Sequence, residues 1–455
     1  MAGLLEDDGV LSPFMAIIAV LKGIVGLCAF ALPAALAKTN LVLGIILLVV
    51  VAVAEGLGTY RLAECSMKLE RSGKQVDSAQ GLGPLGRVSL EVFGLSGYRL
   101  CFINVMLAQF GLSCAYTRTV ANTLQQIWDI PSQELYVLLG VLLCLQSSIE
   151  KMRGVALLSM VALGAFLCIV LCVLRFGLQR IEAGDAVFED VWLPIHWWGT
   201  GACIGPAISA FEGVVVSQHV FTQMKVDDPK PFGAVIIISH VISLALFVFI
   251  GVFGLGTYGQ DVEVMIFDNL PHHAIEVKLC KYTMILVVGI SFQLQMFPLF
   301  SISDSLARRI FNTKEAEGEN AGEELTQEFV NADASDQNDE LSPLSPIKLT
   351  VSTASTGLSR KASTSASSGW SAADYVLMLL LRWGLVLISL ILGAMISSLS
   401  VLKLVGGVFF AYCSMILPGG AHLRLNWSEL GFFEFTSDIF LIGLGLVAVI
   451  LSIIS

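Results

Sequence analysis

Two apolar segments of this chain contain the residue types that could do chemistry. The first carries Lys22 and Gly26, and the second carries Pro206 and Glu212. Glycine and proline weaken a helix, and a charged side chain inside a bilayer is costly unless it is paired or hydrated. Because backbone N–H and C=O groups need partners in lipid, such breaks persist only where they face protein or a hydrated cavity. Each segment is therefore predicted to help build a site.

The composition places the chain in a membrane. Hydrophobic residues make up 55% of the 455 residues and charged residues 14%, with a mean hydropathy of +0.79. Soluble globular proteins carry about 25% charged residues. The formal net charge is -11, but much of the acidity lies between residues 312 and 372 and the rest is near balance. We expect a lipid bilayer as partner and no nucleic acid.

The sequence contains no motif of a known enzyme mechanism. It has no phosphate-binding loop with Gly-Lys-Ser/Thr, no His-Glu-x-x-His and no Gly-x-Ser-x-Gly. The ten cysteines lie mostly in apolar runs without C-x-x-C pairs, so they are interpreted as packing residues; Cys203 and Cys280 are expected near the outer face, without a spacing that predicts a disulfide. We expect neither an enzyme nor a bound metal or cofactor.

Apolar runs of about 20 residues predict eleven transmembrane helices. The first begins at Ser12-Pro13, a cap followed by proline in the first turn, and reaches Leu36. A polar stretch after the second run continues to about Gly94. The other ten runs cover residues 41–62, 97–127, 134–150, 154–176, 197–221, 232–256, 277–310, 373–397, 401–421 and 435–454.

The connections between the runs predict the topology. Lys and Arg are more frequent on the connections that share a side with the N-terminus, which favours a cytoplasmic N-terminus. The acidic first residues argue against a cleavable signal peptide. The predicted order is a short cytoplasmic N-terminus (1–12), eight helices (13–311), a cytoplasmic loop (312–372) and three helices (373–455).

The loop at 312–372 is acidic and rich in Ser and Thr, a composition that predicts disorder. Its Ser342-Pro343 and Ser345-Pro346 pairs are compatible with a phosphorylated regulatory loop, but a tolerated linker is the slightly favoured interpretation.

The breaks recur in spans one and six, five spans apart. Breaks at corresponding places in two halves favour a transporter built from inverted repeats, with its site at mid-membrane where half-helices meet. The alternative is that the glycines only allow close packing of helices.

The residues around these breaks resemble the amino acid/auxin permease family, and most closely its branch of proton-coupled amino acid transporters. In that branch the first span carries Lys-Gly-Asn-Ile-Gly-Thr-Gly, against Lys22-Gly-Ile-Val-Gly-Leu-Cys here, and the sixth carries Phe-Glu-Gly, matched by Phe211-Glu212-Gly213. Weaker similarities lie around Gln109, Met296-Phe297-Pro298 and Leu404-Val405-Gly406. The resemblance implies an all-α membrane protein with a five-plus-five inverted-repeat core of the LeuT-like, APC-type kind, in which helices one and six are broken.

The resemblance also implies an amino acid substrate, which is a zwitterion. The free N–H groups of a half-helix N-terminus bind a carboxylate, and the free carbonyls of a half-helix C-terminus bind an ammonium group. The predicted binding groups are the backbone amides of Gly26, Leu27 and Cys28 and the carbonyls around Ser209, Ala210 and Phe211. Leu27 and Cys28 replace the Thr-Gly of the family, which should narrow the pocket.

Ion coupling is assigned to Lys22, Glu212 and Ser291. Lys22 and Glu212 lie at the two breaks and are expected to pair, with Lys22 in the place of the sodium ion of sodium-coupled relatives; a purely structural pair is the alternative. Titration of either group would then couple transport to protons. Ser291 matches a hydroxyl that helps to bind sodium in those relatives. Tyr116 would close one wall of the pocket, or serve as a packing residue.

The sequence thus predicts a secondary active transporter of small neutral amino acids, working by proton symport and alternating access. The predicted location is the plasma membrane or an endolysosomal or vacuolar membrane. One alternative is an amino acid sensor that signals through the 312–372 loop. Another is a sodium-coupled or facilitative carrier of a different small solute.

Overall fold

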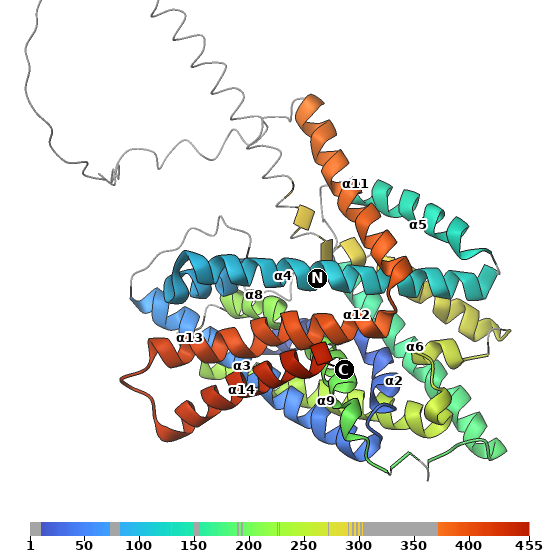
Figure 1. Ribbon diagram of the computed structural model, residues 1–455, viewed down its shortest axis with the longest axis horizontal. Coiled ribbons are helices and arrows are strands. Elements are labelled where there is room, and N and C mark those ends of the chain that lie inside the picture. The colour runs from blue at the N-terminus through green and yellow to red at the C-terminus, as the bar shows by residue number, and fades with distance from the viewer. Residues whose placement is uncertain are drawn as a thin grey trace, which may run out of the picture. The chain divides into compact units, whose positions relative to one another are not determined.

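The computed structural model describes residues 11–72, 82–128, 130–148, 155–188, 191–289 and 372–454, with gaps at 193, 225, 227 and 272, and a few residues between 291 and 303. The chain forms two compact units, residues 1–301 with 383–455, and residues 302–382. The predicted loop at 312–372 lies outside the described residues, except for Ala372. In the part that is described, every regular element is a helix (Figure 1).

The helices of the first half are α1 (Pro13–Ile24), η2 (Leu27–Ala31), α2 (Leu32–Leu36), α3 (Leu41–Arg71), α4 (Gly83–Trp128), α5 (Ser132–Ser147) and α6 (Val155–Ala183). Those of the second half are η4 (Trp197–Gly199), α7 (Thr200–Phe211), α8 (Val214–Met224), α9 (Lys230–Tyr258), η5 (Gly259–Asp261), η6 (Ile266–Asn269), α11 (Ala372–Met395), α12 (Ser398–Leu404), η7 (Val405–Phe410), η8 (Tyr412–Ile416), α13 (Leu417–Leu425) and α14 (Phe432–Ile454).

The first span is broken as predicted. The side chain of Ser12 caps α1 by accepting a hydrogen bond from the Met15 N–H at 3.4 Å. The helix ends at Ile24, and Gly26 adopts an extended conformation before η2 begins. The axis bends by 48° at this point. The first span therefore consists of two short helical pieces instead of one continuous helix.

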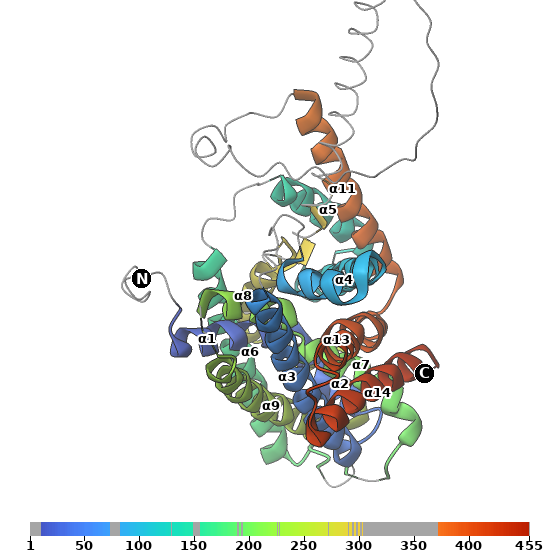
Figure 2. The same cartoon turned by 90° about the vertical axis from the view of Figure 1, so that its left-hand side faces the viewer.

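The sixth span is also interrupted, but without a bend of more than 40°. Helix α7 ends at Phe211, Glu212 turns out of the helix with ψ 126°, and α8 starts at Val214. Its apolar window is 67% buried, the largest share among the described spans. Helix α7 packs against α2, α3, α12 and α14. In Figure 2 its label lies beside those of α2 and α14. A helix that is apolar on all sides is expected at such a central place.

Nine of the eleven predicted spans have helices long and apolar enough to cross a membrane, if the bent pair at the N-terminus counts as one. Helix α5 matches the run at 134–150 but is shorter. For the run at 277–310, the structure describes helix at 275–289 and only fragments beyond. The number eleven therefore stays a prediction.

The connection between the second and third spans is predicted as a polar stretch, but much of it is helical. Helix α3 continues nine residues past the predicted end at Leu62, to Arg71, and α4 begins at Gly83 instead of 97. The chain turns within α4 at Gly94, which has φ 70°. Glycine takes this left-handed conformation without a steric penalty, so it lets two helical pieces meet at a corner.

The tenth span contains two π-helical segments, η7 and η8, between α12 and α13. Segments of this kind are uncommon and occur mostly at functional sites. Both segments contact α14, and η7 contacts α7 and α4.

A buried group of charges joins α3, α13 and α14. The Arg61 guanidinium lies 3.3 Å from Asp438 Oδ1 and 2.7 Å from Glu64 Oε2, and the His422 ring lies 2.7 Å from Asp438 Oδ2. Asp438 is fully buried and His422 nearly so. The group therefore ties three helices together through one carboxylate.

Replacing Asp438 with alanine should destabilise the protein by about 3 kcal/mol, because it leaves Arg61 and His422 without the buried carboxylate that they share. A thermal unfolding experiment in detergent checks this as a lowered apparent Tm. The control is Ser437→Ala, which removes a hydrogen bond from Arg61 Nη2 at 3.0 Å and should cost about 1 kcal/mol. Equal Tm values for the two variants would contradict the role of Asp438.

Candidate functional site

The two breaks face one another in the centre of the helices. A Cβ atom added to Gly213 would lie 2.8 Å from Ile24 Cγ1, and one added to Gly23 would lie 2.9 Å from Val216 Cγ1. Both contacts are shorter than packed side chains allow. Gly23 and Gly213 therefore permit the close approach of α1 and α8, as the packing alternative predicted.

Gly26 has a different role. A Cβ added there would meet no atom within 4 Å, so open space lies beside the break. Its φ of -145° is extended backbone that any residue can adopt. The glycine is therefore required neither by its backbone conformation nor by a neighbouring atom, and its lack of a side chain leaves this space open.

The predicted carboxylate donors precede the first hydrogen bond of η2. The Val25 N–H closes α1 on Leu21, and the next backbone bond is donated by Ala29 to the Gly26 carbonyl at 3.2 Å. The amides of Gly26, Leu27 and Cys28 lie between these two bonds. At a helix start such amides are left for a side chain, solvent or a ligand.

The predicted ammonium acceptors lie at the end of α7, where the last carbonyls of a helix lack partners within it. The side chains here are directed elsewhere. Ser209 Oγ donates to the Leu402 carbonyl at 3.0 Å, and the Phe211 ring packs against Phe247 at 4.8 Å between centroids. Ser209, Ala210 and Phe211 therefore remain predicted to contribute to a site through their backbone.

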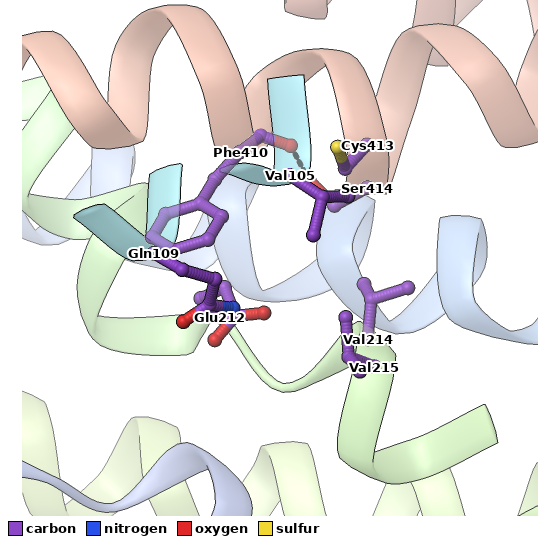
Figure 3. Close-up of a pocket in the computed structure, with 8 residues that line it drawn as sticks. All are labelled: Val105, Gln109, Glu212, Val214, Val215, Phe410, Cys413 and Ser414. Carbon is purple, nitrogen blue, oxygen red and sulfur yellow. Dashed lines mark hydrogen bonds between the residues drawn. The ribbon is translucent and has the colours of Figure 1, made fainter. Parts of the chain in front are cut away.

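Glu212 lines a small pocket beside the break, together with Gln109 of α4 and Ser414 of η8 (Figure 3). Gln109 Oε1 is buried and has no hydrogen-bond partner in the described structure. A buried acceptor without a partner is costly. The pocket thus joins a carboxylate and an amide that are both available to a bound group.

Tyr116 is buried, close to the Cys28 thiol and to the side chain of Gln295. It therefore lies next to the break in the first span. Ser291 is partly buried on helical residues 291–293, and no hydrogen bond within the described residues connects it with this group.

The predicted ion pair between Lys22 and Glu212 is not formed. No described cation lies within 4.0 Å of the Glu212 carboxylate, and Lys22 is half-buried on the last turn of α1. The helix carries Lys22 to the breaks, but not into contact with the carboxylate.

Sequence reasoning missed Glu55. It lies in the middle of α3, is fully buried, and its Oε1 is 2.6 Å from Ser414 Oγ. The signal was available, because a glutamate inside the apolar run at 41–62 meets the same criterion as Glu212.

The two cysteines expected near the outer face have different surroundings. Cys203 is fully buried in α7, whereas Cys280 Sγ lies 3.2 Å from Cys172 Sγ of α6 without a bond between them. Cys280 therefore has Cys172 as its neighbour, and not Cys203.

Helix η6 covers the broken first span. The Phe267 ring lies 5.7 Å from that of Phe30 in η2, and Ile266 is fully buried. Burial raises the pKa of the neighbouring Asp268 to about 7, although the charge of Lys281 and a hydrogen bond from Gln126 lower it. This carboxyl therefore titrates near neutral pH at the edge of the site.

The contact of η6 should be firmer in acid. Since the folded pKa of Asp268 lies above its ordinary value of 3.8, the folded contact gains stability as pH falls through about 7 and has gained all of it near pH 3.8. Hydrogen exchange of a peptide covering residues 263–270, corrected for the intrinsic pH effect, should be slower at pH 5.5 than at pH 8. The Asp268→Asn variant should lose this difference; an unchanged difference would assign it to another group.

Comparison with known proteins shows which family this chain matches. A family model described as transmembrane amino acid transporter protein matches residues 9–455. Vacuolar amino acid transporter 4 of Saccharomyces cerevisiae is 26% identical over 248 residues, which are 51% of this chain and 33% of that protein. Vacuolar amino acid transporter 7 of the same yeast is 24% identical over 290 residues, 61% of this chain and 56% of that protein. The matched stretches thus span only about a third and about half of these relatives.

The crystal structure of MhsT in complex with L-phenylalanine is similar in fold, with a TM-score of 0.53 at 9% identity over 96% of this chain and 97% of that chain. This similarity and the two broken helices confirm the predicted all-α, LeuT-like fold class with its inverted-repeat core. The family model matches nearly the whole chain. The chain therefore belongs to the transmembrane amino acid transporter protein family.

Proposed function

We propose that this protein is a secondary active transporter of small neutral amino acids that works by alternating access. The observation that carries the proposal is the pair of facing breaks, with open space beside Gly26. The amides that precede the first hydrogen bond of η2 lie at one break, and the last carbonyls of α7 lie at the other. Opposite partial charges a few ångströms apart match the two charges of an amino acid. The large side chains of Leu27 and Tyr116 near this space favour a small substrate.

The proposed location is an endolysosomal or vacuolar membrane, with a cytoplasmic N-terminus. Two relatives carry the words vacuolar amino acid transporter in their names. A plasma-membrane location remains the alternative that the sequence left open.

We infer that the driving ion is the proton. Glu212 provides a titratable group at the break of the sixth span. Lys22 lies on the last turn of α1, at the break of the first span, where its ammonium group can satisfy carbonyl oxygens in place of sodium. The two would pair in another state of the transport cycle, when α1 and α8 shift. Ser291 is proposed as a remnant of a sodium site.

Uptake by purified protein in proteoliposomes tests the function. With an inward proton gradient and choline in place of sodium, at least one small neutral amino acid of the twenty should accumulate. Absence of uptake and of counterflow for all twenty would overturn the proposal, and a steep loss on removing sodium at fixed pH would overturn proton coupling. A variant lacking residues 315–370 should still transport; binding without flux in the full chain would favour a sensor.

A further inference from the structure

A second carboxyl group lies in the membrane beside the site. Glu55 Oε1 is 2.6 Å from Ser414 Oγ, and its Oε2 is buried without a hydrogen-bond partner in the described structure. Glu55 takes part in no ion pair with the described residues, and the one charged group acting on it is Glu212, another acid. An ionised carboxylate in such surroundings would be very costly.

The hydrogen bonds around Ser414 fit a Glu55 side chain that is protonated. Its hydroxyl oxygen lies 2.6 Å from Glu55 Oε1 and also 2.8 Å from the Phe410 carbonyl, a bond dashed in Figure 3. A serine hydroxyl has a single hydrogen and cannot donate to both acceptors. If Glu55 carries a proton, it donates to Ser414, and Ser414 donates to Phe410. Both short contacts are then true hydrogen bonds.

Ser414 places Glu55 one hydrogen bond away from the pocket at Glu212. Ser414 lines the same pocket as Glu212 and Gln109, and Glu212 is near enough to Glu55 to interact with it electrostatically. Two nearby carboxylates disfavour ionisation of both at once, so one proton can satisfy the pair.

The same contact also joins α3 directly to the tenth span. Three residues along α3 from Glu55, a Cβ added to Gly58 would lie 1.8 Å from the Ser414 carbonyl oxygen, so α3 and η8 touch backbone to backbone. Loss of the proton would leave Ser414 with two acceptors and α3 with a buried charge, which favours separation of α3 from η8 and entry of water. The protonation state of Glu55 would therefore be transmitted to the tenth span.

We propose that Glu55 binds the coupling proton of the transport cycle and that Ser414 links its protonation to the contact between α3 and the tenth span. This rests on the proposed transport function. The proton enters from the pocket at Glu212, is held as the Glu55 carboxylic acid during the crossing, and leaves when the contact opens.

The test compares two activities of each variant, the exchange of amino acid across the membrane and its accumulation driven by a pH gradient. Glu55→Gln keeps a hydrogen-bond donor toward Ser414 but cannot release a proton. In proteoliposomes it should still exchange internal for external amino acid, yet lose the accumulation that a gradient of one pH unit supports in wild type, about tenfold for one proton per substrate. Glu70→Gln is the control, since Glu70 lies on the same helix in an exposed pair with Arg87 and should accumulate as wild type does.

The outcomes distinguish the two proposals. Accumulation by Glu55→Gln equal to wild type would overturn the role of Glu55 while leaving transport intact, whereas absence of exchange in wild type would overturn the transport function itself. If Glu55→Gln does not fold, Ser414→Ala takes its place. It should shift the pH of half-maximal uptake, while Ser217→Ala, a buried serine of α8, should not. Equal pH profiles for these two would also overturn the proposal.

Discussion

Replacing Gly26 with valine should abolish amino acid uptake while the protein stays folded. The backbone at Gly26 is extended and a Cβ there meets no atom, so the substitution creates neither strain nor a clash at its first atom. The added methyl groups instead occupy the open space beside Gly26. Since pockets that exclude a group of this size discriminate by about 100-fold, initial uptake rates should fall by about that factor.

Gly443→Val is the matched control. Gly443 lies on α14, and a Cβ added to it also meets no atom within 4 Å, but it is exposed on a peripheral helix. Both variants should give the same apparent Tm as wild type to within a few degrees, and Gly443→Val should transport at the wild-type rate. Normal uptake by Gly26→Val would mean that the space beside the break is not the substrate site.

Replacing Gly406 with alanine should severely reduce the yield of folded protein. A Cβ at this position would lie 1.8 Å from the Gly205 carbonyl oxygen and 2.5 Å from Ser209 Oγ. Overpacking costs about 1–3 kcal/mol where side chains can move, and more is expected here because the obstacle is the backbone of the central helix α7. Size-exclusion yield and apparent Tm measure the effect.

The control for Gly406 is Gly384→Ala on α11, where a Cβ meets no atom within 4 Å. Alanine is the better helix former by up to about 1 kcal/mol, so this variant should be as stable as wild type or slightly more stable. A Gly406→Ala variant with normal yield and Tm would show that α7 and the tenth span can separate without loss of the fold.

The breaks in spans one and six could be predicted from sequence because their cause is local. Gly26 and Glu212-Gly213 interrupt apolar runs, and each interruption appears in the structure where the residues place it. The site groups at these breaks are backbone atoms, so their positions follow from the helix ends alone. The family resemblance supplied the pairing of the two spans, which no local pattern contains.

The contacts of side chains could not be predicted in the same way. Lys22 and Glu212 both lie near the breaks, but whether they meet depends on the rotation of α1 about its axis, and that is set by packing of Gly23 on Val216. The partner of Glu55 could not be predicted either, because Ser414 lies 359 residues away in the sequence. The predicted end of the second span was wrong for a third reason. The extension of α3 to Arg71 is too polar to be detected by a hydropathy window.

An electron-microscopy structure with the amino acid that gives the fastest uptake tests the central claim most directly. We expect density for the substrate beside Gly26, with its carboxylate toward the amides of Gly26, Leu27 and Cys28 and its ammonium group toward the carbonyls at the end of α7. Density for the amino acid elsewhere in the protein, with the space between the two breaks empty, would contradict the account.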